Sequence, residues 1–220
     1  MLTVWIGYDK QFDDNTRVQL ESIKKFSTIP VEVKYLKLEE LPLTRTRDPL
    51  QSTDSAFTRW LVPYLANYDG WHLYMDSDMM VRHDLKDLWD LRDESKSVSV
   101  VMHPNYMLED VKFNSKTQSK YRRKNWSSLM LFNAKHCKTL SLDYVNTASG
   151  LDLHQFKWID DDVIGELPKE WNHLVGCEPP NINACIVHWT LGGPWFEEFK
   201  NVEYADEWRS YTLDNSLKSI

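Results

Sequence analysis

The stretch that decides how this chain folds reads Tyr74-Met75-Asp76-Ser77-Asp78-Met79-Met80-Val81. Apolar residues precede and follow two carboxylates that are separated by a single residue. Because positions i and i+2 of a β-strand point to the same side, Asp76 and Asp78 are predicted to converge near a strand end. Two carboxylates that face one point repel each other unless a cation lies between them. A solvated Asp-Ser-Asp turn is the alternative, but the apolar flanks favour carboxylates in the floor of a cleft.

Strand and helix patterns alternate on both sides of this stretch. The expected elements are strands at 2–7, 31–35, 71–75, 98–102 and 184–189, helices at 15–26, 55–66 (broken or kinked at Pro63) and 85–91, and a loop at 40–54. Strands that alternate with helices predict an α/β sheet with a parallel portion.

Three polar residues lie at the expected carboxyl ends of strands, where α/β sheets bind ligands: Asp9, Asp76 and His188. A lone histidine at a strand end is more often structural. Together with Asp76 and Asp78, however, His188 completes a set of two oxygens and one nitrogen that suits Mn²⁺ or Mg²⁺. Gly192 and Gly193 follow closely, and their bare backbone would let a ligand such as a diphosphate approach.

Three further features are candidates for catalysis or ligand binding, and each also has a purely structural interpretation. Asp160-Asp161-Asp162 is either a solvated acidic turn or the source of a carboxylate that acts as a base or nucleophile in acetal chemistry. Arg59 precedes the 71–75 strand and either braces a carboxylate, meets a phosphate or forms a surface salt bridge. The basic run at 120–124 is a solvated loop or a lid over an anionic donor.

Composition narrows the classes of protein. A chain of 220 residues that is 42% hydrophobic suits one α/β domain or two small ones. No stretch approaches the roughly 18 apolar residues needed to span a bilayer, and the start of the chain does not resemble a signal peptide. A net charge of −7 argues against nucleic-acid binding. Cys137, Cys177 and Cys185 are widely spaced and odd in number, as in a reduced, cytoplasmic protein. The oligomeric state is left open.

Taken in order, the motifs resemble those of the family 8 glycosyltransferases, which have the GT-A fold. The matching segments are Asp9-Lys10-Gln11-Phe12 (family Asp-x-x-Tyr), Phe57-Thr58-Arg59 (aromatic-x-Arg), residues 74–81 (Leu-Asp-x-Asp-x-x-Val), Asp84-Leu85 with Leu88-Trp89, Asn125-Trp126-Ser127-Ser128, Asp160-Asp161-Asp162 (Asp-Gln-Asp) and His188 through Pro194-Trp195.

The resemblance implies a GT-A type, Rossmann-like mixed sheet flanked by helices in a single domain. Residues 1–100 would form the nucleotide-binding half, and residues 101–220 the acceptor-side half with the closing His-Gly-Pro-Trp segment. The implied roles are a divalent metal on Asp76, Asp78 and His188; nucleobase contacts from Tyr8, Asp9 and Phe12; other donor contacts from Arg59, Ser77, Gly192 and Gly193; and donor-sugar positioning or catalysis by Asp160 and Asp161.

Two departures from the family pattern bear on function. Gly193 stands where the family has a phosphate-binding Lys, and Asp161 replaces an amide. We expect a cytoplasmic, metal-dependent glycosyltransferase that moves a hexose from a UDP-sugar to a carbohydrate or glycoconjugate acceptor with retention of configuration. The alternatives are a catalytically inactive nucleotide-sugar or carbohydrate-binding protein and a sugar nucleotidyltransferase, although the latter needs a Gly-rich basic loop that residues 7–11 do not provide.

Overall fold

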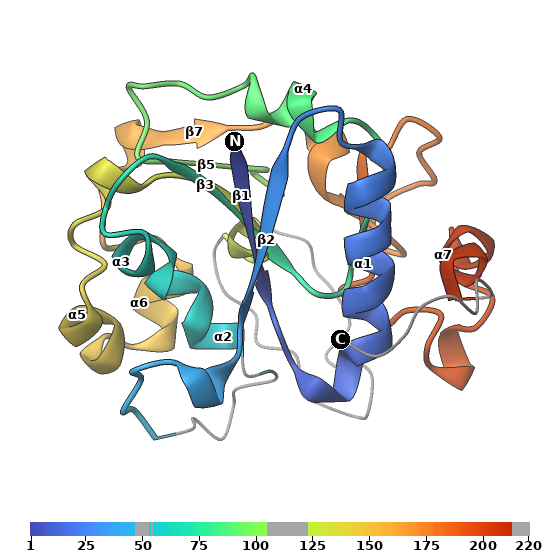
Figure 1. Ribbon diagram of the computed structural model, residues 1–220, viewed down its shortest axis with the longest axis horizontal. Helices are drawn as coiled ribbons and strands as arrows, with labels where there is room; N and C mark the ends of the chain where they lie inside the picture. Colours follow the sequence, from blue (N-terminus) through green and yellow to red (C-terminus); the bar gives the residue numbers. More distant parts are fainter. Residues whose placement is uncertain (47–52, 54, 105–122, 213–220) are drawn as a thin grey trace.

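The computed structural model describes residues 1–46, 53, 55–104 and 123–212 (Figure 1). Its strands are β1 (Leu2–Gly7), β2 (Val31–Leu36), β3 (Trp71–Asp76), β4 (Met79–Val81), β5 (Val98–Val100), β6 (Leu129–Asn133), β7 (Ile164–Glu166), β8 (His173–Leu174) and β9 (Ile186–His188). Its α-helices are α1 (Asp13–Phe26), α2 (Ser55–Thr58), α3 (Val62–Leu65), α4 (Leu85–Trp89), α5 (Leu142–Thr147), α6 (Gly150–His154) and α7 (Ala205–Thr212). The 3₁₀ turns used below are η1 (Lys10–Phe12), η3 (Arg59–Leu61), η5 (Trp126–Ser128), η7 (Asp161–Val163) and η8 (Lys169–Asn172).

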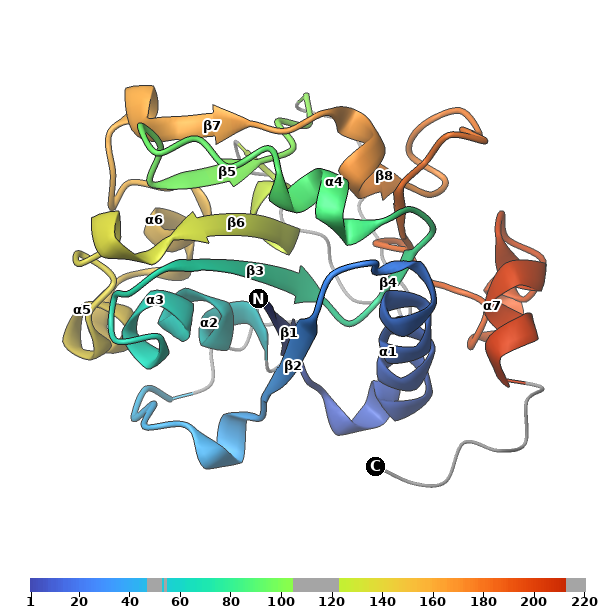
Figure 2. The same ribbon diagram turned by 45° about the horizontal axis from the view of Figure 1, so that its top comes forward.

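Within the described residues, a mixed six-stranded sheet has the order β2-β1-β3-β6-β5-β7. Strands β2, β1 and β3 are parallel, and β6 alone runs against its neighbours β3 and β5. Figure 2 shows β3, β6, β5 and β7 side by side. The sheet takes strands from both halves of the chain, so the predicted mixed α/β sheet in a single domain is confirmed.

Both faces of the sheet are covered, which explains why its central strands carry apolar residues on both sides. On one face Val4, Leu73 and Leu131 pack with residues of α1 and α4. On the other face Tyr74 and Phe132 pack with residues of η3, α3, α5 and α6. A strand that is buried on both faces loses the polar alternation of a half-exposed strand. The result is a three-layer arrangement of helices, sheet and helices.

The predicted helix at 55–66 is three short pieces, α2, η3 and α3, which matches the break expected at Pro63. The ring of Pro63 lies in the first turn of α3, where a missing N–H removes no hydrogen bond. Helix α1 begins at Asp13, two residues before the prediction. Acidic residues in its first turn and Lys24 and Lys25 in its last turn complement the helix dipole.

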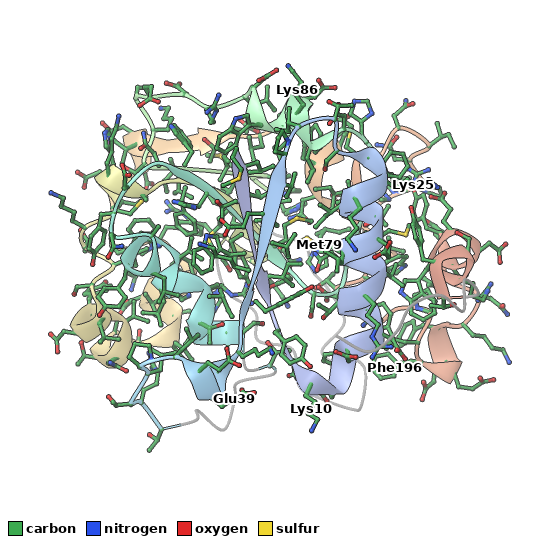
Figure 3. All side chains as sticks on the ribbon, in the orientation of Figure 1. Lys10, Lys25, Glu39, Met79, Lys86 and Phe196 are labelled. Atoms are coloured by element: carbon green, nitrogen blue, oxygen red, sulfur yellow. The ribbon has the colours of Figure 1, made fainter. Side chains whose placement is uncertain are left out.

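A second sheet, of order β4-β9-β8 among the described residues, was not predicted beyond its strand β9. Its side chains pack with Val18 of α1 and Trp208 of α7. Figure 3 shows Met79 of β4 within the body of the protein, whereas Lys10 and Lys86 point outward. Because β4 follows β3 after a two-residue turn, the small sheet is held beside the end of the main sheet.

Two expectations fall partly outside the described residues. Residues 41–46 of the expected loop at 40–54 contain neither helix nor strand, whereas 47–52 and 54 are not described. In the basic run, only Arg123 and Lys124 lie within the described residues. No helix in the described part of the chain has the length and apolar character that crossing a membrane requires.

Candidate metal and donor site

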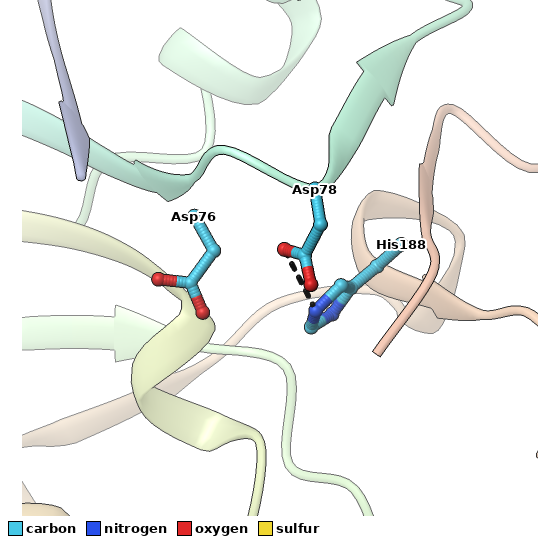
Figure 4. A group of neighbouring side chains, drawn as sticks. All are labelled: Asp76, Asp78 and His188. Carbon is cyan, nitrogen blue, oxygen red and sulfur yellow. Dashed lines mark ion pairs between the residues drawn. The ribbon is translucent and has the colours of Figure 1, made fainter. Parts of the chain in front are cut away.

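Three predicted metal ligands meet where the two sheets join (Figure 4). Asp76 is the last residue of β3, Asp78 lies in the turn before β4, and His188 ends β9, which pairs with β4. One ligand atom from each of the three lies within 4.8 Å of the others, and His188 Nε2 is 3.3 Å from Asp78 Oδ1. Asp78 therefore reaches Asp76 through a tight turn rather than by continuing the strand, which is how the structure differs from the i, i+2 expectation.

The protonated nitrogen of His188 can be assigned from its neighbours. The hydroxyl of Ser128 donates to the carbonyl of Asn125 (2.6 Å), so it accepts from Nδ2 of buried Asn172 (2.9 Å). The amide oxygen of Asn172 then faces His188 Nδ1 at 3.0 Å, and Nδ1 must donate. In the neutral imidazole the lone pair of Nε2 consequently points toward Asp78.

This arrangement fits a divalent cation. Two carboxylates and an imidazole nitrogen with a fixed lone pair are ligands that Mn²⁺ and Mg²⁺ sites use. A lone pair and a carboxylate oxygen that face each other repel unless a proton or a cation lies between them. The hydrogen bond from Nδ1–H to Asn172 is the kind of outer contact that orients a metal-binding histidine.

Arg59 braces Asp76 in a nearly buried ion pair. Arg59 Nη2 is 2.9 Å from Asp76 Oδ1, and Nη1 is 3.3 Å from Oδ2, so the guanidinium meets both carboxylate oxygens. The same guanidinium donates to the carbonyls of Ser55 (3.0 Å) and Ser127 (2.9 Å), while the hydroxyl of Tyr74 donates to Asp76 Oδ1. Burial raises the pKa of Asp76, and the charge of Arg59 opposes that rise. Of the roles considered for Arg59, the structure shows the one that braces a carboxylate.

The predicted nucleobase residues follow β1, at the same edge of the main sheet as Asp76. The buried carboxylate of Asp9 accepts from the backbone N–H of Gln11 (3.1 Å) and from its side-chain amide (2.9 Å). The hydroxyl of Tyr8 donates to Asp13 (3.1 Å). The ring of Phe12 lies edge-on to Trp195 (6.4 Å) and Phe196 (6.2 Å), so this loop packs against the closing segment. Nucleobase binding by these residues stays a prediction.

Gly192 and Gly193 are glycines because aromatic side chains of this chain lie against them. A Cβ on Gly193 would be 2.2 Å from the indole of Trp195, and one on Gly192 would be 2.6 Å from the ring of Phe199. Gly192 also has a φ of 138°, which side chains rarely adopt. Packing within the chain therefore accounts for both glycines, and contact with a donor diphosphate stays a prediction for them, as donor contact does for Ser77 in the 76–78 turn.

Asp160 and Asp161 are exposed and lie just before β7. Strand β7 runs parallel to β3, so its start is at the opposite edge of the sheet from Asp76. Arg123 lies between these two regions. Its guanidinium is 2.6 Å from the carboxylate of Asp161, and in the sequence Arg123 is two residues before Asn125. Asn125, in turn, accepts a hydrogen bond from Thr190, two residues after His188. The catalytic role of Asp160 and Asp161 remains a prediction.

Sequence reasoning missed Asn172, His103 and Glu178. His103 follows the predicted strand 98–102 directly, so the rule that selected Asp76 could also have found it. No such signal marks Asn172, which lies in the 3₁₀ turn η8, or Glu178, which lies in a loop. Their positions near the site depend on contacts with distant parts of the chain.

No protein-family model matches this sequence. In structure, the chain is similar to the WbbM bifunctional glycosyltransferase, with a TM-score of 0.70 and 14% identity over 97% of this chain and 50% of that one. It is also similar to the galactosyltransferase LgtC in complex with donor and acceptor sugar analogues, with a TM-score of 0.63 and 12% identity over 100% and 97% of the two chains. The chain thus spans half the length of the WbbM chain. Identities this low show the fold alone, which is the GT-A fold of glycosyltransferases.

One relative is similar in sequence as well. Protein CDI of Arabidopsis thaliana is 39% identical over 216 residues, which cover 93% of this chain and 83% of the relative. Identity at this level over nearly the whole length reflects common descent rather than a shared fold alone. The chain therefore belongs to the same protein family as Protein CDI.

Proposed function

We propose that this chain is a metal-dependent, retaining glycosyltransferase of the family 8 type, which moves a hexose from a UDP-sugar to a carbohydrate or glycoconjugate acceptor in the cytoplasm. The observation that carries the proposal is the convergence of Asp76, Asp78 and His188 at the strand ends of a GT-A fold. LgtC, which has the same fold, was solved with donor and acceptor sugar analogues. The half 1–100 would bind the nucleotide and the half 101–220 the acceptor.

In this proposal the protein groups bind and orient the donor. Asp76, Asp78 and His188 would hold Mn²⁺ or Mg²⁺, which when bound neutralises the diphosphate that departs with the nucleotide. Arg59 keeps the Asp76 carboxylate in place through both of its oxygens. Tyr8, Asp9 and Phe12 would contact the base, and Ser77, Gly192 and Gly193 the donor. Asp160 and Asp161 would position the sugar or stabilise positive charge at its reacting carbon.

Metal-dependent nucleotide binding tests this proposal directly. We expect Asp78→Ala to abolish Mn²⁺-dependent UDP binding in calorimetry while the far-UV circular dichroism spectrum stays unchanged. The matched control is Asp143→Ala, which removes an exposed carboxylate in the first turn of α5, and it should bind UDP as the wild type does. Unchanged UDP affinity of Asp78→Ala with Mn²⁺ present would refute the assignment of the site.

One observation favours a second candidate, a nucleotide-sugar-binding protein without catalysis. The position of the family's phosphate-binding Lys is Gly193, and the Trp195 ring fills the space that a side chain there would need. Hydrolysis of a UDP-sugar in the absence of acceptor separates the two functions. A glycosyltransferase releases UDP slowly with Mn²⁺ present, whereas a binding protein releases none above the rate without protein.

A further inference from the structure

A carboxylate links two buried histidines beside the candidate metal site. Glu178 Oε1 is 3.4 Å from His103 Nδ1, and Glu178 Oε2 is 3.1 Å from His173 Nδ1. His103 and His173 are 4% and 2% exposed, so both imidazoles meet the carboxylate where water has little access. Each Nδ1 can donate its proton to one oxygen, and a carboxylate accepts two such bonds without competition. Neither the metal set nor the donor contacts proposed above use these three residues.

The three residues come from three different parts of the fold. His103 lies three residues beyond β5, which runs parallel to β3, so it is at the same edge of the main sheet as Asp76. His173 belongs to β8 of the small sheet, next to the strand that carries His188. Glu178 lies in the turn after β8. The contacts of Glu178 therefore connect the main sheet to the small sheet.

Backbone hydrogen bonds connect Glu178 to the strand that carries His188. In the β8–β9 ladder, Leu174 is the partner of His188, and the N–H of Val175 donates to the carbonyl of His188 (3.0 Å). The N–H of Glu178 donates to the carbonyl of Leu174 (3.1 Å), which closes the turn. A shift of Glu178 would consequently move the backbone that pairs with His188.

We propose that Glu178 is a positioning residue for the metal site. By binding His103, in the segment that follows β5 of the main sheet, and His173, in β8 of the small sheet, it fixes the separation between His188, on the small sheet, and Asp76, at the end of β3. A divalent cation needs all of its ligands at bonding distance at the same time, so a loose joint between the sheets weakens binding without removing a ligand. This inference rests on the metal site of the proposed function.

Mn²⁺ affinity, measured from the electron paramagnetic resonance signal of the free ion, tests the role of Glu178. Glu178→Gln keeps the shape of the side chain, but an amide has one acceptor oxygen, so the second histidine can keep a bond only by moving its proton from Nδ1 to Nε2 and accepting from the amide N–H. We expect about tenfold weaker Mn²⁺ binding, because contacts behind metal ligands typically change affinity by about 10–100-fold. The control is Glu94→Gln, which also loses hydrogen bonds, to Lys135 and Trp71. It lies near the start of β3, away from the site, and should bind Mn²⁺ within about twofold of the wild type.

A pair of variants at His103 separates positioning from general stability. Asn carries an N–H close to the place of the imidazole Nδ1, so His103→Asn should keep the bond to Glu178 and bind Mn²⁺ within about threefold of the wild type. His103→Leu removes the donor and should bind about tenfold more weakly. The thermal shift caused by Mn²⁺ should shrink in the Leu variant and persist in the Asn variant. Should Glu178→Gln fail to fold, this pair carries the same test.

The possible failures are distinguishable. If the wild-type protein binds no Mn²⁺, the metal site of the proposed function is wrong, and this inference falls with it. If the wild type binds Mn²⁺ but Glu178→Gln and His103→Leu bind it equally well, only the positioning role of Glu178 is overturned. Equal weakening in Glu94→Gln would also overturn it, because the effect would then follow from lost stability alone.

Discussion

Replacing Gly193 by alanine is expected to destabilise the protein through one side chain, Trp195. The added Cβ would lie 2.2, 2.3 and 2.8 Å from three carbons of the Trp195 indole, whereas ordinary contacts of a Cβ begin near 3.4 Å. The ring would have to retreat by about 1.2 Å. The left-handed region is not involved at Gly193, in contrast to Gly192, so the cost arises from the contact rather than from the backbone.

The size of the effect follows from how little the indole can move. Its ring centroid lies 5.8 Å from Trp189, 6.1 Å from Trp208 and 6.4 Å from Phe12, so rings surround it on several sides. Overpacking of this kind costs about 1–3 kcal/mol. For a domain of this length, a loss of about 2 kcal/mol lowers the melting temperature by about 4–8 °C.

Thermal denaturation and urea titration of Gly193→Ala measure this cost. Gly150→Ala is the control, since its Cβ would lie 3.3 Å from the ring of Phe57, a far milder contact at the start of a helix, and it should shift the free energy of unfolding by less than about 1 kcal/mol. In a Trp195→Ala background, the same change at Gly193 should cost less than about 0.5 kcal/mol. A melting temperature of Gly193→Ala equal to that of the wild type would refute the packing explanation.

Four further predictions follow from the site and its surroundings. With Mn²⁺, UDP should raise the melting temperature more than GDP, ADP or CDP, and equal shifts would exclude a uracil-reading pocket. Asp161→Asn should slow turnover at least about tenfold, which is roughly 1.4 kcal/mol of barrier, and full turnover in this variant would remove Asp161 from the mechanism. The wild-type enzyme should form an α-linked product from an α-linked donor, and a β-linked product in the proton NMR spectrum would exclude retention. In EDTA, Arg59→Gln should lower the free energy of unfolding by about 3 kcal/mol, because Asp76 loses its buried counter-ion. Adding Mn²⁺ should restore part of the lost stability, and a urea titration that shows no loss in EDTA would contradict the prediction. Hydrogen bonds from Lys135 and then Trp71 lower the pKa of Glu94 from 4.5 to about 2. Its contribution to stability is therefore complete above pH 4.5 and lost as the pH falls toward 2, so Glu94→Gln should flatten the pH dependence of the melting temperature in that window, and an unchanged slope would count against the assignment.

Strands β1, β2, β3 and β5 of the main sheet could be predicted from the sequence because their apolar or alternating residues leave a local signal, whereas β6 and β7 were not predicted as strands. β1 and β3 are each six residues of mostly apolar or β-prone sequence, and both were expected at nearly the observed bounds. The small sheet left no such signal, since β4 has three residues and β8 has two. Strands this short are formed by pairing with β9, and pairing between distant segments has no period that a local pattern can show.

The residues of the candidate metal site were predictable for a related reason. Asp76 and His188 end strands, and a rule about strand ends places them at one edge without any knowledge of side-chain contacts. Asn172 and Glu178 act through side-chain contacts made in the folded chain, with His188 and with His103 and His173 respectively. Only the folded chain brings such partners together. The sequence could therefore name the three residues of the candidate metal site and Arg59, but not Asn172 and Glu178.

In the proposed glycosyltransferase, the charges at the site compensate for the absence of the Lys that family 8 members have before Pro194. When both carboxylates are ionised, Asp76, Asp78 and the guanidinium of Arg59 sum to one net negative charge. With a divalent cation bound, the same groups would carry one net positive charge and attract a diphosphate. Without Arg59 they would be neutral, although the cation itself would bind more tightly. Arg59 thus supplies, from beneath the carboxylate, a positive charge that Gly193 cannot supply from the closing segment. Arg59→Gln should consequently weaken UDP binding at saturating Mn²⁺ even as it strengthens the binding of Mn²⁺, and a parallel loss of both affinities would show that Arg59 only holds the fold together.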